Sequence, residues 1–381
     1  MFMLFNNSAI DVMDMMMNSM IDLNQHRVFQ DQFGRQKRKL RISVTDRCNF
    51  KCVYCMPEHP VWMKKHELLS FEELYVFCHF MVQQGIEQIR ITGGEPLMRQ
   101  GIVHFIEQLQ QLKNIGLKRI SMTTNAHYLE QYAVPLKQAG LDDLNISLDC
   151  LDPIQFKVLT QKELSPVLAG INAAKEAGLH IKINTVLMKG LNEDQIIPLV
   201  KWAHLNHFEP RFIEFMPLDG DQKWSSDAVV TEHDILTTLS KAFDVGIEHV
   251  QGANPARSYT VNGKAVGIIS TISNSFCGSC DRLRLNAQGQ FYNCLFAQQG
   301  LSLKAEIQQL SSLLLADYTV ESLPNHTEST LVHAQSQLQE RLADYIWHKA
   351  QGYDAIQSTL KQEYSMQPSH VRKISMHMIG G

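Results

Sequence analysis

Six of the eight cysteines fall into two groups of three whose spacing suits iron-sulfur chemistry. The first group, Cys48, Cys52 and Cys55, has the pattern C-x3-C-x2-C and directly follows an apolar run. Three thiolates on one short loop can hold three corners of a cubane cluster, which leaves one iron without a protein ligand. Such an open iron can bind a substrate or a cofactor. Zinc is the alternative, but structural zinc takes four ligands, and His59 or His66 would have to supply the fourth.

The second group, Cys277, Cys280 and Cys294, has the pattern C-x2-C-x13-C. Zinc is a stronger alternative here than for the first group, because two-plus-two zinc sites use similar spacings. No further cysteine follows Cys294 in the sequence, so three ligands again indicate an open position. The two remaining cysteines, Cys78 and Cys150, lie in apolar segments and are expected to be buried structural thiols.

Six cations stand where they could hold an anion. Arg282 and Arg284 alternate after Cys280, so in an extended chain both point to one face, as a fork suited to phosphates. Four more lie within predicted strands that are otherwise largely apolar: Arg41, Arg90, Lys182 and Arg211. A cation in a strand covered on both faces needs a partner, and a buried salt bridge is the alternative to a ligand. With a net charge of -4, this grouping favours a bound polyanion.

The elements that must position these residues follow a repeated pattern from residue 40 to about 216. A helical stretch ends at Gly followed by Ile or Leu, and a short apolar strand comes next, as at Gly85, Gly116, Gly140 and Gly178. The predicted strands cover residues 40 to 45, 88 to 92, 118 to 124, 143 to 148, 180 to 187 and 211 to 216. Strands alternating with helices predict a parallel sheet, either doubly wound or a partial or full barrel. The first cysteines then lie at a strand's C-terminal end, where α/β barrels keep their active sites.

After about residue 245 the pattern changes. Strand-like runs at 257 to 261 and 265 to 272 flank Asn262-Gly263, a strong signal for a hairpin turn. Residues 300 to 365 are predicted to be helical and carry no chemical motif.

Composition excludes several classes of protein. The 381 residues contain no apolar run near the ~18 residues of a membrane-spanning helix, and the net charge gives no basic field for nucleic acid, so we expect neither partner. Residues 1 to 27 form a Met-rich leader without the basic start and unbroken apolar stretch of a secretory signal. We therefore expect a cytoplasmic protein, in which cysteines serve as ligands or buried thiols rather than in disulfides.

The run TDRCNFKCVYCMPE resembles the radical S-adenosylmethionine (SAM) superfamily, and Gly93-Gly94-Glu95-Pro96 looks like its methionine-binding GGEP motif. Two glycines let the backbone approach a ligand closely, and Glu95 can accept a hydrogen bond from the amino group of a bound amino acid. Within the superfamily, both cysteine groups, the Arg282 and Arg284 pair and the final Gly380-Gly381 resemble the GTP 3′,8-cyclase family of molybdenum cofactor biosynthesis. This resemblance runs from about Gly34 to Leu303 and resumes at the tail.

The resemblance implies a fold and a division of the chain. The fold is α/β, a partial (β/α)6 TIM-type barrel with a C-terminal extension that carries a second iron-sulfur cluster. The leader would cover 1 to 27, the barrel 28 to 245, and the auxiliary-cluster and GTP-binding region 246 to 381. The Gly-Gly tail, after a run at 374 to 378 that we expect to be extended, is slim enough to enter a narrow site.

The resemblance also implies a lyase reaction and its participants. Cys48, Cys52 and Cys55 (the first triad) would hold a 4Fe-4S cluster whose open iron chelates SAM, and Cys277, Cys280 and Cys294 (the second triad) a second 4Fe-4S cluster that contacts guanine. A 5′-deoxyadenosyl radical would remove the ribose 3′ hydrogen of GTP, and closure on C8 would give 3′,8-cyclo-7,8-dihydro-GTP. The implied SAM positions are Tyr54, Gly93, Gly94, Glu95, Ser147 and Met216. The implied GTP positions are Arg41, Arg90, Thr123, Lys182, Arg211, Arg282 and Arg284, of which Arg282 and Arg284 are also assigned a catalytic role.

The implied partners are GTP, a reductase or flavodoxin-type electron donor, and cyclic pyranopterin monophosphate synthase as the next enzyme, with a homodimer as one assembly. The sequence departs from the family pattern at Ala126, where a glycine is more usual, in a longer stretch at 310 to 345, and at 159 to 163, which lacks an arginine. Two other readings stay open, a different radical SAM enzyme with an auxiliary cluster and a non-catalytic iron-sulfur or zinc protein. Bound guanine nucleotide would separate both from the cyclase.

Overall fold

The computed structural model describes residues 29–218, 221, 224–247, 252–316, 325–358 and 375–380. The Met-rich leader at 1 to 27 and the final Gly381 lie outside these residues. Among the helices that it describes, none combines the length and apolar character needed to cross a membrane.

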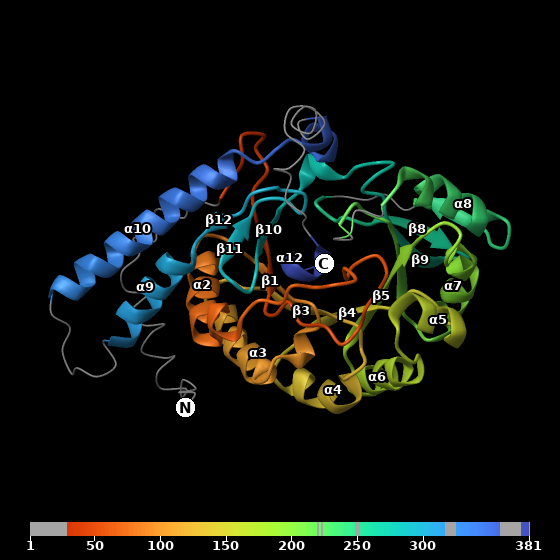
Figure 1. Cartoon of the computed structure of the whole chain (residues 1–381), viewed down its shortest axis with the longest axis horizontal. Coiled ribbons are helices and arrows are strands. Elements are labelled where there is room, and N and C mark those ends of the chain that lie inside the picture. Colours follow the sequence, from red (N-terminus) through yellow and green to blue (C-terminus); the bar gives the residue numbers. More distant parts are fainter. Residues whose placement is uncertain are drawn as a thin grey trace.

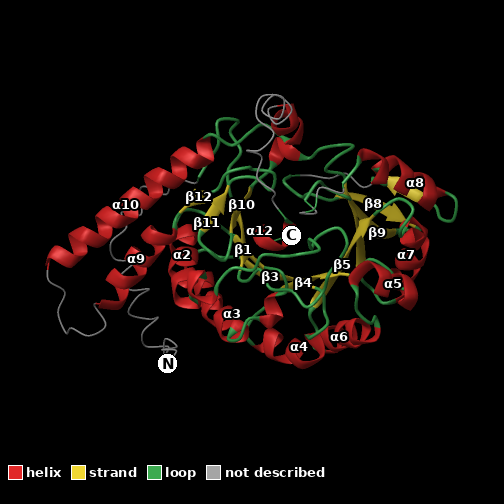
Figure 2. Cartoon of the chain, viewed as in Figure 1, coloured by secondary structure: helices red, strands yellow, loops and turns green. Residues whose placement is uncertain are grey.

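Parallel strands in chain order form the centre of a curved sheet, and helices cover its outer face (Figures 1 and 2). The strands are β1 (Lys39–Ser43), β2 (Gln88–Thr92), β3 (Arg119–Thr124), β4 (Asp143–Ser147), β5 (His180–Leu187) and β6 (Glu209–Glu214). The helices are α2 (Phe71–Gln83), α3 (Ile102–Gln111), α4 (Leu129–Gln138), α5 (Pro153–Thr160), α6 (Ser165–Glu176), α7 (Ile196–Leu205) and α8 (Glu232–Ser240). This arrangement confirms the partial (β/α)6 barrel and the six strands that the sequence predicts.

Local signals in the sequence explain where the helices begin and end. Ser70 accepts a hydrogen bond from the Glu73 amide at 3.1 Å, and the Glu73 carboxylate accepts one from the Ser70 amide at 2.6 Å, which is a capping box at the start of α2. Asp152 caps α5, with Pro153 in the first turn. The glycines that end the helices before β2, β3, β4 and β5 have positive φ, for example 92° at Gly85 and 70° at Gly178, whereas His207, with φ of 63°, takes this position before β6.

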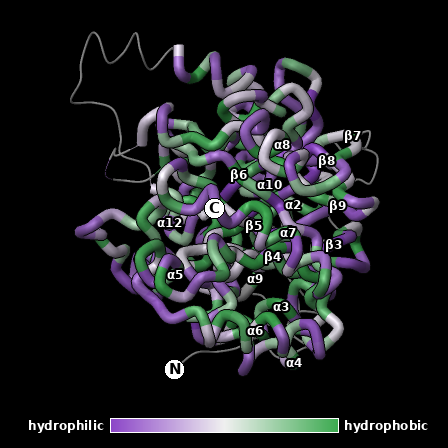
Figure 3. The backbone as a smooth tube through the Cα atoms, turned by 90° about the vertical axis from the view of Figure 1, so that its right-hand side faces the viewer, coloured by the Kyte–Doolittle hydropathy of each residue, from purple (hydrophilic) through white to green (hydrophobic). Residues whose placement is uncertain are grey.

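Alternation along the strands separates the core from the site. Leu40 and Ile42 on β1 pair in register with Ile89 and Ile91 on β2, and all four are fully buried under the helices. The intervening Arg41 faces the inside of the arc instead. Figure 3 shows hydrophobic stretches around β4, β5 and β6 in the interior. The inner face of these strands lines a cavity.

Chain beyond residue 245 adds strands to both edges of this sheet. On one edge, β9 (Lys264–Ile269) runs parallel to β6, and β8 (Arg257–Val261) and β7 (Val245–Ile247) follow. Asn262 and Gly263 join β8 to β9 with φ of 49° and 75°, as expected for the predicted hairpin turn. On the other edge, β10 (Arg282–Leu285) pairs parallel to β1, and β11 (Gln290–Tyr292) and β12 (Leu301–Ser302) extend it.

Helices α9 (Lys304–Ala316) and α10 (Asn325–Trp347) confirm the predicted helical character of the later chain, and α9 packs between α10 and α2 (Figure 1). The expectation of an extended run at 374 to 378 is wrong over its described part, because Met376–Ile379 forms the short helix α12. An extended tail needs a strand edge to pair with. Here the Met376 amide instead donates to the Leu218 carbonyl, and the Gly380 amide closes a helical turn on the Met376 carbonyl.

Candidate active site

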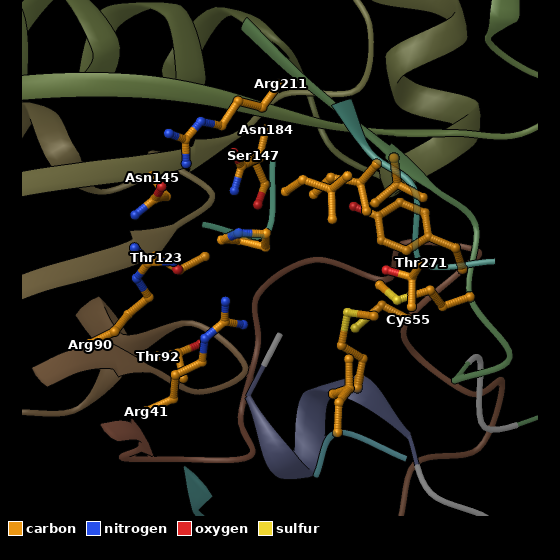
Figure 4. Close-up of a pocket in the computed structure, with 18 of the residues that line it drawn as sticks. Arg41, Cys55, Arg90, Thr92, Thr123, Asn145, Ser147, Asn184, Arg211 and Thr271 are labelled. Carbon is orange, nitrogen blue, oxygen red and sulfur yellow. The ribbon is translucent and has the colours of Figure 1, made fainter. Parts of the chain in front are cut away.

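One cavity on the inner side of the arc collects both cysteine triads. Its empty space is about 1730 Å³, counting the open mouth. Most of the predicted site residues line it: Cys48, Cys52, Cys55, Cys277, Cys280, Cys294, Tyr54, Gly93, Gly94, Ser147, Met216, Arg41, Arg90, Thr123, Arg211, Arg282 and Arg284. Glu95 and Lys182 do not. Figure 4 shows Arg41, Arg90 and Arg211 reaching inward on the side of the cavity away from Cys55.

The loop after β1 presents the first triad as three free thiols on the cavity wall. Burial raises the pKa of Cys48 and of Cys55 to about 12 and that of Cys52 well above its usual value. Bare thiols are therefore neutral here, and a bound metal would have to displace their protons.

The spacing of the donors tests which metal group these thiols fit. In the described part of the chain, no three His, Cys, Asp or Glu side chains lie close enough to hold one metal ion. Zinc needs all its ligands around one ion at about 2.0–2.3 Å, whereas each cysteine of a cubane binds a different iron. Two sets of three separated thiols therefore fit iron-sulfur clusters better than zinc.

The second triad lies in a different electrostatic setting. Cys277 begins a short turn before β10, and Cys294 follows β11. Burial opposes ionisation of Cys280, but the nearby charges of Arg282 and Lys349 lower the pKa of its thiol to about 6. Arg282 also stacks over Phe276, with its guanidinium 4.6 Å from the ring centroid. Positive charge therefore surrounds the second triad and not the first.

The GGEP loop after β2 packs directly against the first cysteine loop. The Gly94 amide donates to the Thr45 carbonyl at 2.7 Å, and the Glu95 amide donates to the Arg47 carbonyl at 2.8 Å. A Cβ on Gly94 would lie 2.3 Å from the Arg47 carbonyl oxygen. The glycines thus allow the close approach of two loops as well as exposing backbone to the cavity.

Glu95 is fully buried behind this loop, and its carboxylate already accepts three hydrogen bonds. The donors are the Leu97 amide at 3.1 Å, the Thr124 hydroxyl at 2.8 Å and the Asn125 amide at 2.8 Å. Burial nevertheless raises the pKa of Glu95 to about 7. In this structure Glu95 holds the loop, and its direct contact with a ligand amino group stays a prediction.

We expect Gly94→Ala to separate the two loops, because the methyl group would collide with backbone rather than with a movable side chain. Overpacking of this kind costs roughly 1–3 kcal/mol of unfolding free energy. SAM binding, measured by equilibrium dialysis, should fall together with the denaturant midpoint. Gly278→Ala is the matched control, since a Cβ there meets no atom within 4 Å in the other cysteine loop. Unchanged SAM binding by Gly94→Ala would contradict the packing argument.

Sequence reasoning missed several polar residues of the cavity wall. Asp149 accepts a hydrogen bond from the Tyr54 hydroxyl at 2.7 Å, and burial raises the pKa of its carboxyl to about 6. Asn145 and Asn184 also line the wall, in register with Lys182 and Arg211 on neighbouring strands. The search for charges within strands passed over neutral amides. Period-two spacing from Ser147 would have found both Asn145 and Asp149.

Three arginines stand side by side at the deep end of the cavity. Arg284 on β10 pairs in register with Arg41 on β1, which pairs with Arg90 on β2. Burial, followed by the charges of Arg284 and Arg90, lowers the pKa of Arg41 well below its usual value. Arg90 donates to the Ser121 hydroxyl at 3.1 Å, and Arg284 donates to the Gly380 carbonyl. None of the three forms a salt bridge with a carboxylate of the described residues, which suits them to bind an added anion.

Lys182 and Arg211 instead form salt bridges within the protein, which was the alternative to binding a ligand. Both reach Glu209, at 3.2 Å and 2.7 Å respectively. Although burial opposes its charge, these two cations lower the pKa of Glu209. Their positive charge is therefore partly neutralised within the protein.

The described part of the C-terminal tail enters the same cavity. The Ser375 hydroxyl donates to the Cys55 carbonyl at 2.7 Å, and Met376 lines the wall. Gly380 has φ of 74°, and a Cβ on it would lie 2.3 Å from the Thr92 methyl group. A glycine is therefore required where the tail passes β2.

Comparisons with known proteins complete this description. A model of the radical SAM superfamily matches residues 42–203, and a model named Molybdenum Cofactor Synthesis C matches residues 208–355. A GTP 3′,8-cyclase of Streptomyces coelicolor is 43% identical over 289 residues, which cover 74% of this chain and 84% of the relative. A GTP 3′,8-cyclase of Staphylococcus aureus is 40% identical over 290 residues, which cover 73% and 85%.

Among solved structures, Streptococcus suis SuiB bound to S-adenosylmethionine aligns with a TM-score of 0.56 at 15% identity, covering 81% of this chain and 70% of that chain. SuiB bound to its precursor peptide SuiA aligns with a TM-score of 0.54 at 15% identity, covering 82% and 66%. At this identity the likeness shows the fold alone.

Proposed function

Because the chain belongs to the GTP 3′,8-cyclase family of radical SAM enzymes, its activity is the cyclisation of GTP, the first step of molybdenum cofactor biosynthesis, and we propose that the cavity between its two triads carries this reaction. The observation that carries this proposal is the composition of one cavity. It joins two separated sets of three thiols to a row of three arginines that form no salt bridge with a described residue. This combination suits a metal cofactor at one end and a polyanion at the other.

The first triad would hold the 4Fe-4S cluster that the family uses. That cluster would supply the electron that cleaves bound SAM into methionine and the 5′-deoxyadenosyl radical, which starts the cyclisation. Tyr54, Gly93, Gly94, Ser147 and Met216 line the adjoining wall and would bind SAM. Glu95 would act by holding the Gly94 backbone in place.

At the other end, the residues would bind and orient GTP. Arg41, Arg90 and Arg284 would take the phosphates, since a guanidinium binds phosphate through paired hydrogen bonds. Thr123 and Arg211 line the wall beside them. Lys182 would also bind GTP once its salt bridge to Glu209 breaks. Arg282 would assist at the second triad, whose proposed second 4Fe-4S cluster would face the guanine. The curved sheet would position the reacting ribose.

The wider setting of the enzyme also forms part of this proposal. A reductase or flavodoxin-type protein would supply the electron, and cyclic pyranopterin monophosphate synthase would consume the product. We further propose a cytoplasmic location and a homodimer, by analogy with the family.

The test is anaerobic reconstitution with iron and sulfide, followed by dithionite, SAM and GTP. We expect about eight irons per chain, four in each cubane, and GTP-dependent formation of the cyclised nucleotide with 5′-deoxyadenosine, read together by mass spectrometry. About four irons would overturn the second cluster. Eight irons with 5′-deoxyadenosine but no GTP product would mean that the substrate is a molecule other than GTP. Zinc in place of iron would overturn the radical chemistry.

A further inference from the structure

A group of buried charges lies behind the second triad, outside the set of residues assigned to SAM or GTP. Three cations and one carboxylate make it up, and we call it the basic backing: Arg35, Lys37, Lys349 and Asp31. The side chains of Lys37 and Asp31 are fully buried, and Lys349 is 2% exposed. Burying lysines is costly, so their positions require a reason.

Each cation of the basic backing donates to a backbone carbonyl at or beside a cysteine of the second triad. Arg35 donates to the Cys277 carbonyl at 2.8 Å, and Lys37 donates to the Cys280 carbonyl at 2.9 Å. Lys349 donates to the carbonyl of Asn293, the residue before Cys294. The two cysteine loops are thus tied to three ammonium or guanidinium groups rather than to neutral donors.

The charges of the basic backing do not balance. Asp31 pairs with Arg35 and with Lys37, both at 2.6 Å, so one carboxylate faces two cations. Lys349 forms no ion pair with a described residue, and its side chain lines the same cavity as Cys280. At neutral pH a net positive charge therefore stands against the second triad.

We infer that Lys349, supported by Lys37, is a positioning residue for the second cluster whose ammonium also raises that cluster's reduction potential. The inference rests on the second cluster of the proposed function. A 4Fe-4S cluster with three thiolates carries a net charge of -1 when oxidised and -2 after it takes one electron from an external donor. A buried positive charge stabilises the more negative form, and net charge and hydrogen bonds set such potentials. The second cluster is therefore easier to reduce than the same cluster without this backing.

A merely structural role for Lys349 predicts something different. If its ammonium only ties the Asn293 carbonyl, its loss should lower cluster occupancy and leave the potential of the remaining clusters unchanged. The potential separates the two roles without reference to turnover.

The experiment uses the full chain with Cys48, Cys52 and Cys55 replaced by serine, so that only the second triad can load. At pH 7, dithionite titration followed by electron paramagnetic resonance gives the midpoint potential. Lys349→Met should lower the ratio of reduced to oxidised cluster at fixed potential about tenfold, which is ~59 mV for one electron. Lys349→Arg should keep the potential of the parent, and Lys37→Met should shift it in the same direction as Lys349→Met.

Lys137→Met is the matched control, because Lys137 donates to the Gly178 carbonyl at 2.9 Å on an exposed surface far along the barrel. A parent that loads no cluster would overturn the second cluster and this inference together. If the parent loads its cluster normally, and Lys349→Met and Lys37→Met both keep the parent's midpoint potential, the inference alone would be overturned.

Discussion

Cys52→Ser is expected to abolish 5′-deoxyadenosine formation, while Cys294→Ser should retain it and lose only the cyclised nucleotide. Both residues lie in the wall of one cavity, but in separate triads. Loss of a residue that only orients a metal ligand costs 10–100-fold, so loss of a ligand itself should exceed about 100-fold. Each variant should bind about four irons instead of about eight, because only one triad stays intact.

The control for this pair is Cys150→Ser. Cys150 is fully buried, and its thiol contacts the Asp152 carbonyl and the Gln155 side chain, contacts that a hydroxyl can also make. It should keep full iron content and both products. Iron content by colorimetry and both nucleosides by mass spectrometry settle the comparison. Full product from Cys294→Ser would remove the second cluster from the reaction.

Local patterns in the sequence were enough to predict the barrel. Helix caps at Ser70 and Asp152, and a glycine with positive φ before each of β2 to β5, act within a few residues, so the strand positions could be read directly. At the C-terminal tail, local sequence patterns did not predict the structure correctly. The run at 374 to 378 was expected to be extended, but Met376–Ile379 forms a helix.

Long-range pairing decides what the cations do, and the sequence does not show it. Arg284 stands beside Arg41 because β10 pairs with β1, far away along the chain. Lys182 and Arg211 look the same as Arg41 in sequence, but only those two reach Glu209. Lys37 and Lys349 were passed over because their partners are backbone carbonyls, which leave no mark in the sequence.

Arg41→Met is expected to weaken GTP binding and, at the same time, to stabilise the ligand-free protein. Arg41 lies between Arg90 and Arg284, and its pKa is lowered first by burial and then by these charges, so its ion opposes folding. Removing it relieves that repulsion and should raise the melting temperature. A hydrogen bond to a charged group contributes about 1.5–3 kcal/mol, which corresponds to roughly 10–150-fold in the dissociation constant for GTP.

Guanosine and a second variant make this prediction specific. Guanosine lacks phosphates, so its affinity should not change in Arg41→Met if the arginine binds phosphate. Arg119→Met is the matched control: Arg119 is already paired with the buried Asp143, and it lies outside the cavity wall. That variant should keep its GTP affinity and lower the melting temperature, so it differs from Arg41→Met on both measurements. Equal losses of GTP and guanosine in Arg41→Met would assign Arg41 to the folding of the site, because a contact with phosphate cannot weaken the binding of a nucleoside.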